Sequence, residues 1–221
     1  MVSISALQDI TKSAKEKNAQ LIAVSKTKPI DTITTIYNTG QRDFGENKVQ
    51  ELVNKYEMLP KDIQWHMIGN LQSNKVKYIA PFIYLIHSVN TIKLANEINK
   101  QAEKNNRVIN ILLEIHIAEE NSKSGFTKKE ITEVLSNNAL GMLKNISICG
   151  LMGMATYTDN QTIIRNEFRG LKHFFEELKA TYFYNQPEFR HISMGMSGDY
   201  KIALEEGSTM IRVGSAIFGD R

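Results

Sequence analysis

Lys26 is the residue of this sequence with the clearest chemical potential. It follows the apolar run 21–24, and the chain then continues through Thr, Lys and Pro at positions 27–29. An apolar run that breaks in this way is typical of a buried strand reaching its carboxyl end, where parallel sheets bind ligands. An amine held neutral beside a low-dielectric core can condense with an aldehyde. The alternative is a solvated lysine just past a strand.

Two segments rich in Gly and Ser near the carboxyl terminus form a candidate anion site. Ser197 stands at the expected start of a short helix, which it can cap, while Gly195 and Gly198 let an anion approach the backbone amides. Gly214 and Ser215 supply further amides and a hydroxyl after the next apolar run. A helix cap alone explains Ser197 but not the second Gly-Ser pair. The two segments together therefore predict phosphate binding.

Arg212 interrupts the otherwise apolar run 210–213, two residues before these amides. A ligand that carries both a phosphate and a carbonyl would use the lysine and the anion site together. Pyridoxal 5′-phosphate (PLP) and sugar phosphates are such ligands. In a PLP site Arg212 would donate a hydrogen bond to the pyridine nitrogen, and its alternative role is an ion pair with a carboxylate such as Glu114. A sugar phosphate would instead make Lys26 the Schiff-base lysine of an aldolase.

Short apolar runs predict the strands that must position these groups. Most of the runs are too continuous to alternate, as in strands that are covered on both faces. The runs are 21–24, 41–44, 63–68, 83–89, 108–117, 146–152, 189–192 and 210–213. Between them, apolar residues recur at helical spacing, most clearly over 49–56 and 164–182.

Eight strands that alternate with helices in 221 residues favour an α/β (β/α)₈ TIM barrel, with residues 1–221 forming a single domain. An additional helix is expected over residues 4–15, before the first strand. An open doubly wound sheet is the alternative, although no GxGxxG follows the first run. In a barrel, groups that follow the strands share one face, so the candidate residues would meet there.

Composition argues against several classes of protein. The net charge of +3 is spread along the chain, too evenly for a nucleic-acid-binding stripe. Cys149 is the single cysteine and lies in an apolar run, which predicts a buried thiol in a reducing, cytoplasmic setting. No run approaches the length of a membrane span, and the five histidines lack metal-ligand spacing.

A series of segments spans nearly the whole chain in a specific order. They are IAVSKTKP (22–29), FGEN (44–47), WHMIG (65–69), LQSNK (71–75), GLM (150–152), SMGMS (193–197), STM (208–210) and RVG (212–214). With these segments the sequence resembles the pyridoxal phosphate homeostasis protein family. The barrel of that family resembles the amino-terminal domain of alanine racemase, a fold-type III PLP barrel.

The resemblance implies a role for each cofactor-binding residue. Lys26 would carry PLP as a covalent aldimine, Arg212 would face the ring nitrogen, and the remaining positions are Asn47 near the cofactor and Ser197, Gly214 and Ser215 at the phosphate. Two places depart from the family pattern. Lys48 stands where an aromatic residue is frequent, and EIHI at 114–117 replaces a more typical Val-Asn pair. Both concern the shape of the mouth rather than the cofactor positions.

The resemblance also implies a protein that sequesters PLP and delivers it to apo PLP-dependent enzymes without efficient turnover. An amino-acid racemase is the alternative. Racemisation needs an acid/base group on each side of the α-carbon, of which Lys26 can supply one. In racemases the opposing tyrosine comes from a second domain, for which a barrel of this length leaves no room. Arg212 stays protonated and leaves the pyridine unprotonated, a poorer electron sink.

Further expectations concern partners and a second site. The expected partners are PLP and apo-enzymes, with no nucleic acid and no membrane, and the expected assembly is a monomer or weak homodimer. The segment 122–125, with Lys123 between serines, could approach anions at the mouth of the barrel as a weaker second PLP site.

Overall fold

Within residues 2–119 and 124–219, which the computed structural model describes, eight parallel strands close into a barrel in chain order. The strands are β1 (Gln20–Val24), β2 (Asp43–Glu46), β3 (Gln64–Met67), β4 (Leu85–Val89), β5 (Ile109–Glu114), β6 (Ile146–Met152), β7 (His191–Ser193) and β8 (Met210–Val213). The barrel closes because β1 pairs with β8, in register from Gln20↔Met210 to Ala23↔Val213. The predicted (β/α)₈ barrel is therefore confirmed, and the open-sheet alternative is wrong.

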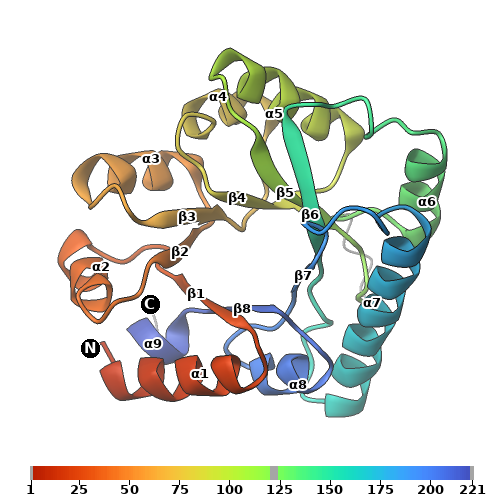
Figure 1. Ribbon diagram of the computed structural model, residues 1–221. Coiled ribbons are helices and arrows are strands. Elements are labelled where there is room, and N and C mark those ends of the chain that lie inside the picture. Colours follow the sequence, from red (N-terminus) through yellow and green to blue (C-terminus); the bar gives the residue numbers. More distant parts are fainter. Residues whose placement is uncertain (1, 120–123, 220–221) are drawn as a thin grey trace.

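Helices surround the strands on the outside of the barrel (Figure 1). They are α1 (Ile4–Glu16), α2 (Ile30–Tyr37), α3 (Val49–Met58), the 3₁₀ turn η1 (Ser73–Lys75), α4 (Val76–Ile79), α5 (Ile92–Lys104), α6 (Lys128–Ser136), α7 (Gln161–Thr181), α8 (Tyr200–Glu205) and α9 (Ser215–Phe218). Helix α1 confirms the additional helix expected before the first strand. Ser3 caps it by accepting a hydrogen bond from the Ala6 N–H. The Ser3 N–H donates to the Ile217 carbonyl at 2.8 Å and ties α1 to α9.

The strand boundaries differ most from the apolar pattern at β2, which lies two residues later than the run 41–44, and at β5, which ends at Glu114 rather than at residue 117; a smaller difference at β7 has a visible cause. The pattern predicts a strand from Phe189, but β7 begins at His191. Phe189 is fully buried and stacks against Phe183 and Phe175, with ring centroids 4.0 and 4.8 Å away. Phe189 is therefore apolar because it packs against other aromatic side chains, one of them on α7, and not because it belongs to a strand.

The hydrophobic core has two parts. Its main part lies between the strands and the surrounding helices. A smaller cluster comes from β4, β5, β6 and β8 alone, as expected for the inside of a barrel, and includes Cys149. Cys149 is a buried free thiol, as predicted, and burial raises its pKa. The strands also bury polar side chains, namely Glu46, His66, His87, Ser88, Glu114, Ser193 and Arg212.

Candidate functional site

The carboxyl ends of four adjacent strands carry the predicted ligand groups. Strands β7, β8, β1 and β2 are hydrogen-bonded neighbours in that order. Lys26 follows β1, Asn47 follows β2, Ser197 follows β7, and Gly214 and Ser215 follow β8. Arg212 lies within β8. The barrel thus brings all six predicted residues onto one arc of its rim.

Lys26 lies in a tight turn between β1 and α2. The residue after it, Thr27, has φ of 64°, in the left-handed region that β-branched residues seldom adopt. Such a conformation costs on the order of 1–3 kcal/mol and persists only where the surroundings enforce it. Here the Thr27 N–H donates to the Glu51 carboxylate at 2.5 Å, and the Lys28 N–H donates to the Ser25 carbonyl at 3.0 Å. The turn is therefore fixed from both sides of Lys26.

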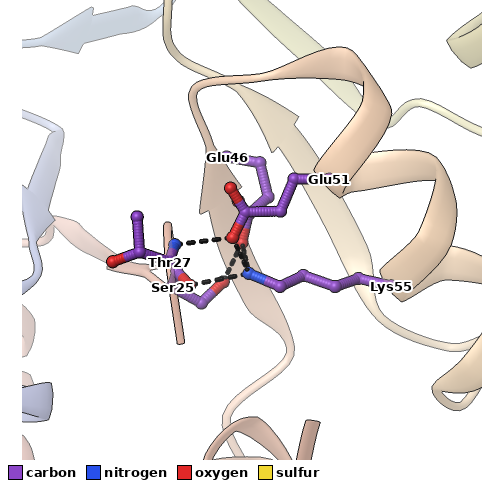
Figure 2. Close-up of polar contacts among 5 residues, drawn as sticks. All are labelled: Ser25, Thr27, Glu46, Glu51 and Lys55. Carbon is purple, nitrogen blue, oxygen red and sulfur yellow. Dashed lines mark hydrogen bonds and ion pairs between the residues drawn. The ribbon is translucent and has the colours of Figure 1, made fainter. Parts of the chain in front are cut away.

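A network of polar and charged groups, of which only Glu51 is partly exposed, holds this turn (Figure 2), and we call Ser25, Glu46, Glu51 and Lys55 the clamp. The Lys55 ammonium contacts Glu46 at 2.8 Å and Glu51 at 2.6 Å, and donates to the Ser25 carbonyl at 2.8 Å. The Ser25 hydroxyl donates to Glu46 at 2.6 Å. The clamp thus joins the end of β1 to the end of β2 and to helix α3.

The charged groups Glu46 and Lys55 of the clamp lie in the protein interior. Burial raises the pKa of Glu46, while the Lys55 ammonium acts in the opposite direction. Lys55 is 5% exposed, so its ion pairs are shielded from solvent. The half-buried Lys26 amine, by contrast, has no hydrogen bond or ion pair with the described residues. An amine without a partner on a fixed turn is available to a ligand.

Ser197 joins the loops that follow β7 and β8. Its hydroxyl accepts a hydrogen bond from the Gly214 N–H at 3.2 Å. The prediction that Ser197 caps the next helix is wrong. The N-cap of α8 is Asp199, and its carboxylate accepts the Met196 N–H at 2.5 Å, so the loop folds back before the helix begins. Ser197 and Gly214, predicted separately from sequence, are in direct contact.

The glycines of the β7 loop differ in what they permit. A Cβ on Gly195 would lie 2.5 Å from the Ala203 Cβ, and Gly195 has φ of 96°. This glycine is therefore required for packing against α8 rather than for approach of an anion, contrary to prediction. A Cβ on Gly198 would meet nothing within 4 Å, so only Gly198 leaves space beside the backbone.

Arg212 is buried, and both of its acceptors are uncharged. Its guanidinium donates to the Ser193 hydroxyl and, at 3.2 Å, to the Gly153 carbonyl. Burial lowers the pKa of Arg212 to about 10, while Asp199 and Glu114 act to raise it. The side chain therefore remains charged at neutral pH. The ion pair with Glu114, the alternative from sequence, is absent among the described residues.

Two carboxylates at the ends of strands have an oxygen without a partner. Glu46 Oε2 and Glu114 Oε2 are buried and accept no hydrogen bond from the described residues. Burial raises the pKa of both groups, although the Ser124 hydroxyl acts to lower that of Glu114. Asn47 is half-buried, and its side-chain amide makes no hydrogen bond within the described part of the chain. These polar atoms offer a ligand further partners.

The clamp and the contacts of Arg212 were not predicted from sequence. Glu51 and Lys55 are four residues apart on α3, which is a recognisable helical ion pair. Nothing in the sequence indicates that this pair reaches Ser25. His87 and Ser193 lie in different strands, 106 residues apart, and their contact follows only from barrel closure. The polar histidines inside apolar strands were the available signal.

Several other expectations concern sites elsewhere. Ser122 and Lys123, of the candidate second anion site, lie outside the described residues. Within the described ranges no cluster of His, Cys, Asp or Glu could hold a metal ion. Among the same residues, no helix is both long and apolar enough to span a membrane.

Comparison with known proteins places the chain among PLP-related barrels. The family model for the alanine racemase N-terminal domain matches residues 4–221. A protein named pyridoxal phosphate homeostasis protein from Aquifex aeolicus is 41% identical over 207 residues, covering 93% of this chain and 89% of the relative. One of the same name from Haemophilus influenzae is 39% identical and covers 97% of this chain and 92% of the relative.

Solved structures of PLP-related barrels are also similar to this chain. PipY from Synechococcus elongatus, solved without PLP, has a TM-score of 0.90 at 33% identity, covering 97% of this chain and 99% of PipY. PipY with PLP bound has a TM-score of 0.87 over the same shares of both chains. Alanine racemase from Bartonella henselae has a TM-score of 0.69 at 14% identity, covering 100% of this chain and 61% of the racemase. This last likeness concerns the fold alone.

Proposed function

Because the chain belongs to the alanine racemase N-terminal domain family, we propose that it is a PLP-binding protein of PLP homeostasis, which holds the cofactor reversibly through Lys26 and delivers it to apo-enzymes. Residues 1–221 would act as one PLP-binding barrel domain. The observation that carries the proposal is the unpartnered Lys26 amine, fixed at the end of β1 beside the Ser197–Gly214 contact at the end of β8. The relatives named for PLP homeostasis and the PipY structure with PLP support it.

The residues present fit the cofactor. A Cβ on Gly214 would lie 3.1 Å from the Val24 carbonyl oxygen and 3.2 Å from the Val24 Cβ, so the two rim segments approach as closely as a glycine allows. Arg212 keeps guanidinium N–H groups without acceptors in the described structure. A ligand with a phosphate, an aldehyde and a ring nitrogen uses groups of these kinds.

Each residue has a distinct task in this proposal. PLP, when bound, supplies an aldehyde that condenses reversibly with a primary amine. Lys26 presents its amine for that bond, while Ser197, Gly214 and Ser215 would hold the phosphate, the Gly214 N–H exchanging its bond to the Ser197 hydroxyl for one to a phosphate oxygen. Arg212 donates to the ring nitrogen without releasing its proton. Asn47 lies at the neighbouring strand end, beside Lys26.

The same residues favour storage over turnover. Arg212 is charged and surrounded by neutral acceptors, so it donates a hydrogen bond but does not transfer a proton to the ring. An unprotonated ring stabilises carbanions poorly, which disfavours most PLP-dependent reactions. The protein is therefore proposed to lack an efficient enzymatic activity of its own.

The binding half of the proposal is tested by chemical trapping. Protein mixed with PLP should turn yellow, and borohydride should fix the pyridoxyl group to the peptide that contains Lys26. Lys26→Met should abolish the label. Lys28→Met is the matched control, because Lys28 lies in the same loop and donates to the Gly219 carbonyl at 2.9 Å. A colourless protein that traps a sugar phosphate would favour an aldolase instead.

The delivery half is tested by transfer. The PLP-loaded protein is mixed with an apo PLP enzyme, and the rate of reactivation is compared with that given by the same concentration of free PLP. Delivery is supported if reactivation is faster than with free PLP, or if the PLP stays protected from the solution during transfer, and if Lys26→Ala loses this effect. Reactivation no faster than with free PLP would contradict the delivery role and leave only the storage role. Steady release of an inverted amino acid at an ordinary enzymatic rate would show a racemase.

A further inference from the structure

A chain of hydrogen bonds crosses the inside of the barrel and ends at Arg212. Asp43 Oδ1 lies 3.1 Å from His66 Nε2, and His66 Nδ1 lies 2.9 Å from His87 Nε2. His87 Nδ1 lies 2.9 Å from the Ser193 hydroxyl, which accepts from Arg212. The chain starts at the first residue of β2 and passes through β3 and β4 to β7 and β8. We call Asp43, His66, His87 and Ser193 the relay.

The relay is almost entirely shielded from water. His66, His87 and Ser193 are each 0% exposed. Strands β4 and β7 are not neighbours in the sheet, so the bond between His87 and Ser193 spans the barrel interior. Only Asp43, half-buried at the amino-terminal end of the strands, reaches toward solvent, and Gln20 also donates to its Oδ1 at 2.7 Å. Buried polar groups of this kind are costly unless every one is satisfied.

The two ends fix the direction of every hydrogen bond between them. Arginine can only donate, and an ionised carboxylate can only accept. Ser193 therefore accepts from Arg212 and has its own proton to give, for which His87 Nδ1 is the acceptor available among the described residues. His87 then donates through Nε2 to His66 Nδ1, and His66 donates through Nε2 to Asp43.

The opposite direction fails on two counts. It would leave the Ser193 hydroxyl proton without an acceptor in the described structure, and it would require His66 to be doubly protonated although it is fully buried. Burial lowers the pKa of His87 well below its ordinary value, and the neighbouring His66, Arg212 and His191 lower it further. A neutral His87 agrees with the first direction.

We propose that the relay is a positioning device for Arg212, with both imidazoles held as the neutral Nε2–H tautomer, so that the guanidinium is oriented toward the PLP ring nitrogen. The inference rests on the proposed function for its ligand, but the tautomers belong to the protein alone. Ser193 and His87 are positioning residues in this scheme, because they act through Arg212. Asp43 sets the direction of the whole chain from the far end of the barrel.

Two measurements test the proposal. Nitrogen-15 NMR of the PLP-free protein should show His66 and His87 as neutral Nε2–H imidazoles at neutral pH. A doubly protonated His66, or an Nδ1–H proton on His87, would overturn the direction whether or not PLP binds. In the Ser193→Ala variant His87 should keep its Nε2–H proton, because His66, whose tautomer is set by Asp43, still accepts it.

The second measurement is PLP binding. Ser193→Ala should weaken PLP binding about tenfold and shift the absorption maximum of the bound cofactor, since a hydrogen bond to a charged group is lost. Ser193→Thr, which keeps the hydroxyl, should restore both. Ser208→Ala is the matched control, because Ser208 is equally buried and donates to the Met194 and Met210 carbonyls without contacting Arg212.

The outcomes separate the two proposals. Unchanged affinity and spectrum in Ser193→Ala, relative to Ser208→Ala, would remove the positioning role. The same loss in both variants would make the effect one of general packing and would also remove it. Absence of PLP binding by the wild-type protein would overturn the proposed function and the ligand assigned to Arg212, while the NMR result would still decide the direction of the relay.

Discussion

The two cationic side chains of the candidate site are supported by opposite means. The turn that carries Lys26 is held by ionised groups, since the clamp places the Lys55 ammonium between two carboxylates. Arg212 is held by uncharged groups, a serine hydroxyl and a backbone carbonyl. On the Lys26 side the charges fix the backbone and leave the functional amine unpaired. On the Arg212 side the functional group is itself the buried charge, and neutral partners leave that charge available to a ligand.

The two kinds of support should contribute differently to the free energy of unfolding. Breaking a buried ion pair leaves a charge without compensation, which costs several kcal/mol, whereas losing one neutral hydrogen bond costs less. The clamp should therefore dominate the stability of this part of the barrel, while the relay should act mainly on the ligand. The free energy of unfolding of variants on each side distinguishes the two kinds of support.

The largest effect is expected for Lys55→Met. This substitution leaves Glu46 buried without its cation, so the free energy of unfolding in urea should fall by about 3–5 kcal/mol. The double variant Glu46→Gln/Lys55→Met should recover part of the loss, since no unpaired charge remains between them. The control is Arg42→Met, which breaks an exposed pair with Asp62 and should cost less than about 1 kcal/mol. Equal losses of unfolding free energy in Lys55→Met and Arg42→Met would show that the clamp does not dominate the stability of this region.

A smaller effect is expected for Glu51→Gln. Glu51 is partly exposed, and its carboxylate accepts from Thr27 and Lys55, so its neutralisation should lower the free energy of unfolding by about 1–2 kcal/mol. It should also slow the trapping of PLP by Lys26, because the acceptor of the N–H of the left-handed Thr27 is no longer charged and binds it more weakly. Glu57→Gln, on the exposed face of the same helix, is the matched control and should change neither quantity. A normal trapping rate in Glu51→Gln would show that the negative charge of Glu51 is not needed to hold the turn.

The third prediction concerns the pH dependence of stability, which has opposite signs for His87 on the Arg212 side and for Glu46 on the Lys26 side. The pKa of His87 lies well below 6.5 in the folded protein, so the unfolded chain binds more protons below that pH. Its contribution to stability is present above pH 6.5 and is lost as the pH falls, at no more than about 1.4 kcal/mol per pH unit. The pKa of Glu46 is raised above 4.5, so its contribution is present below that pH and is lost as the pH rises.

Unfolding in urea between pH 7 and 5 checks this prediction. His87→Asn keeps an acceptor for Ser193 but does not titrate, so the variant should lose less stability than the wild type over this interval. An identical pH dependence in both proteins would assign the slope to another group, of which His191 is the nearest candidate because burial lowers its pKa to about 4.

The smallest effect on stability is expected for Lys26→Met. The Lys26 amine has no partner among the described residues, so its removal should change the free energy of unfolding by less than about 0.5 kcal/mol. The same substitution should abolish covalent PLP binding. A loss of stability comparable to that of Lys55→Met would mean that Lys26 belongs to the support rather than to the ligand.

Sequence alone predicts the barrel and the positions of the ligand groups, because both depend on local patterns. Continuous apolar runs mark the strands, and residues such as Lys26 and Gly214 follow directly after them. Position after a strand is sufficient to place a group on the rim of a barrel. Exact strand limits are less predictable, since an apolar residue such as Phe189 packs equally well outside a strand.

The supporting contacts were not predictable, because they join side chains that are distant in sequence. Ser197 has a good local reason to cap α8, but its hydroxyl accepts instead from Gly214 in the neighbouring loop. His87 reaches Ser193 only when β4 and β7 face one another across the closed barrel. Local pattern thus identifies the groups proposed to meet a ligand, whereas tertiary geometry determines what holds those groups.

The pairing of β1 with β8 has a consequence for biosynthesis. Lys26 leaves the ribosome early, whereas Arg212 and Gly214 lie in the last strand and the loop after it. A nascent chain that has not yet reached β8 therefore has Lys26 without the residues proposed to bind the phosphate and the ring nitrogen. In the proposed function, the complete cofactor site therefore forms only after the last strand has been made and has closed the barrel.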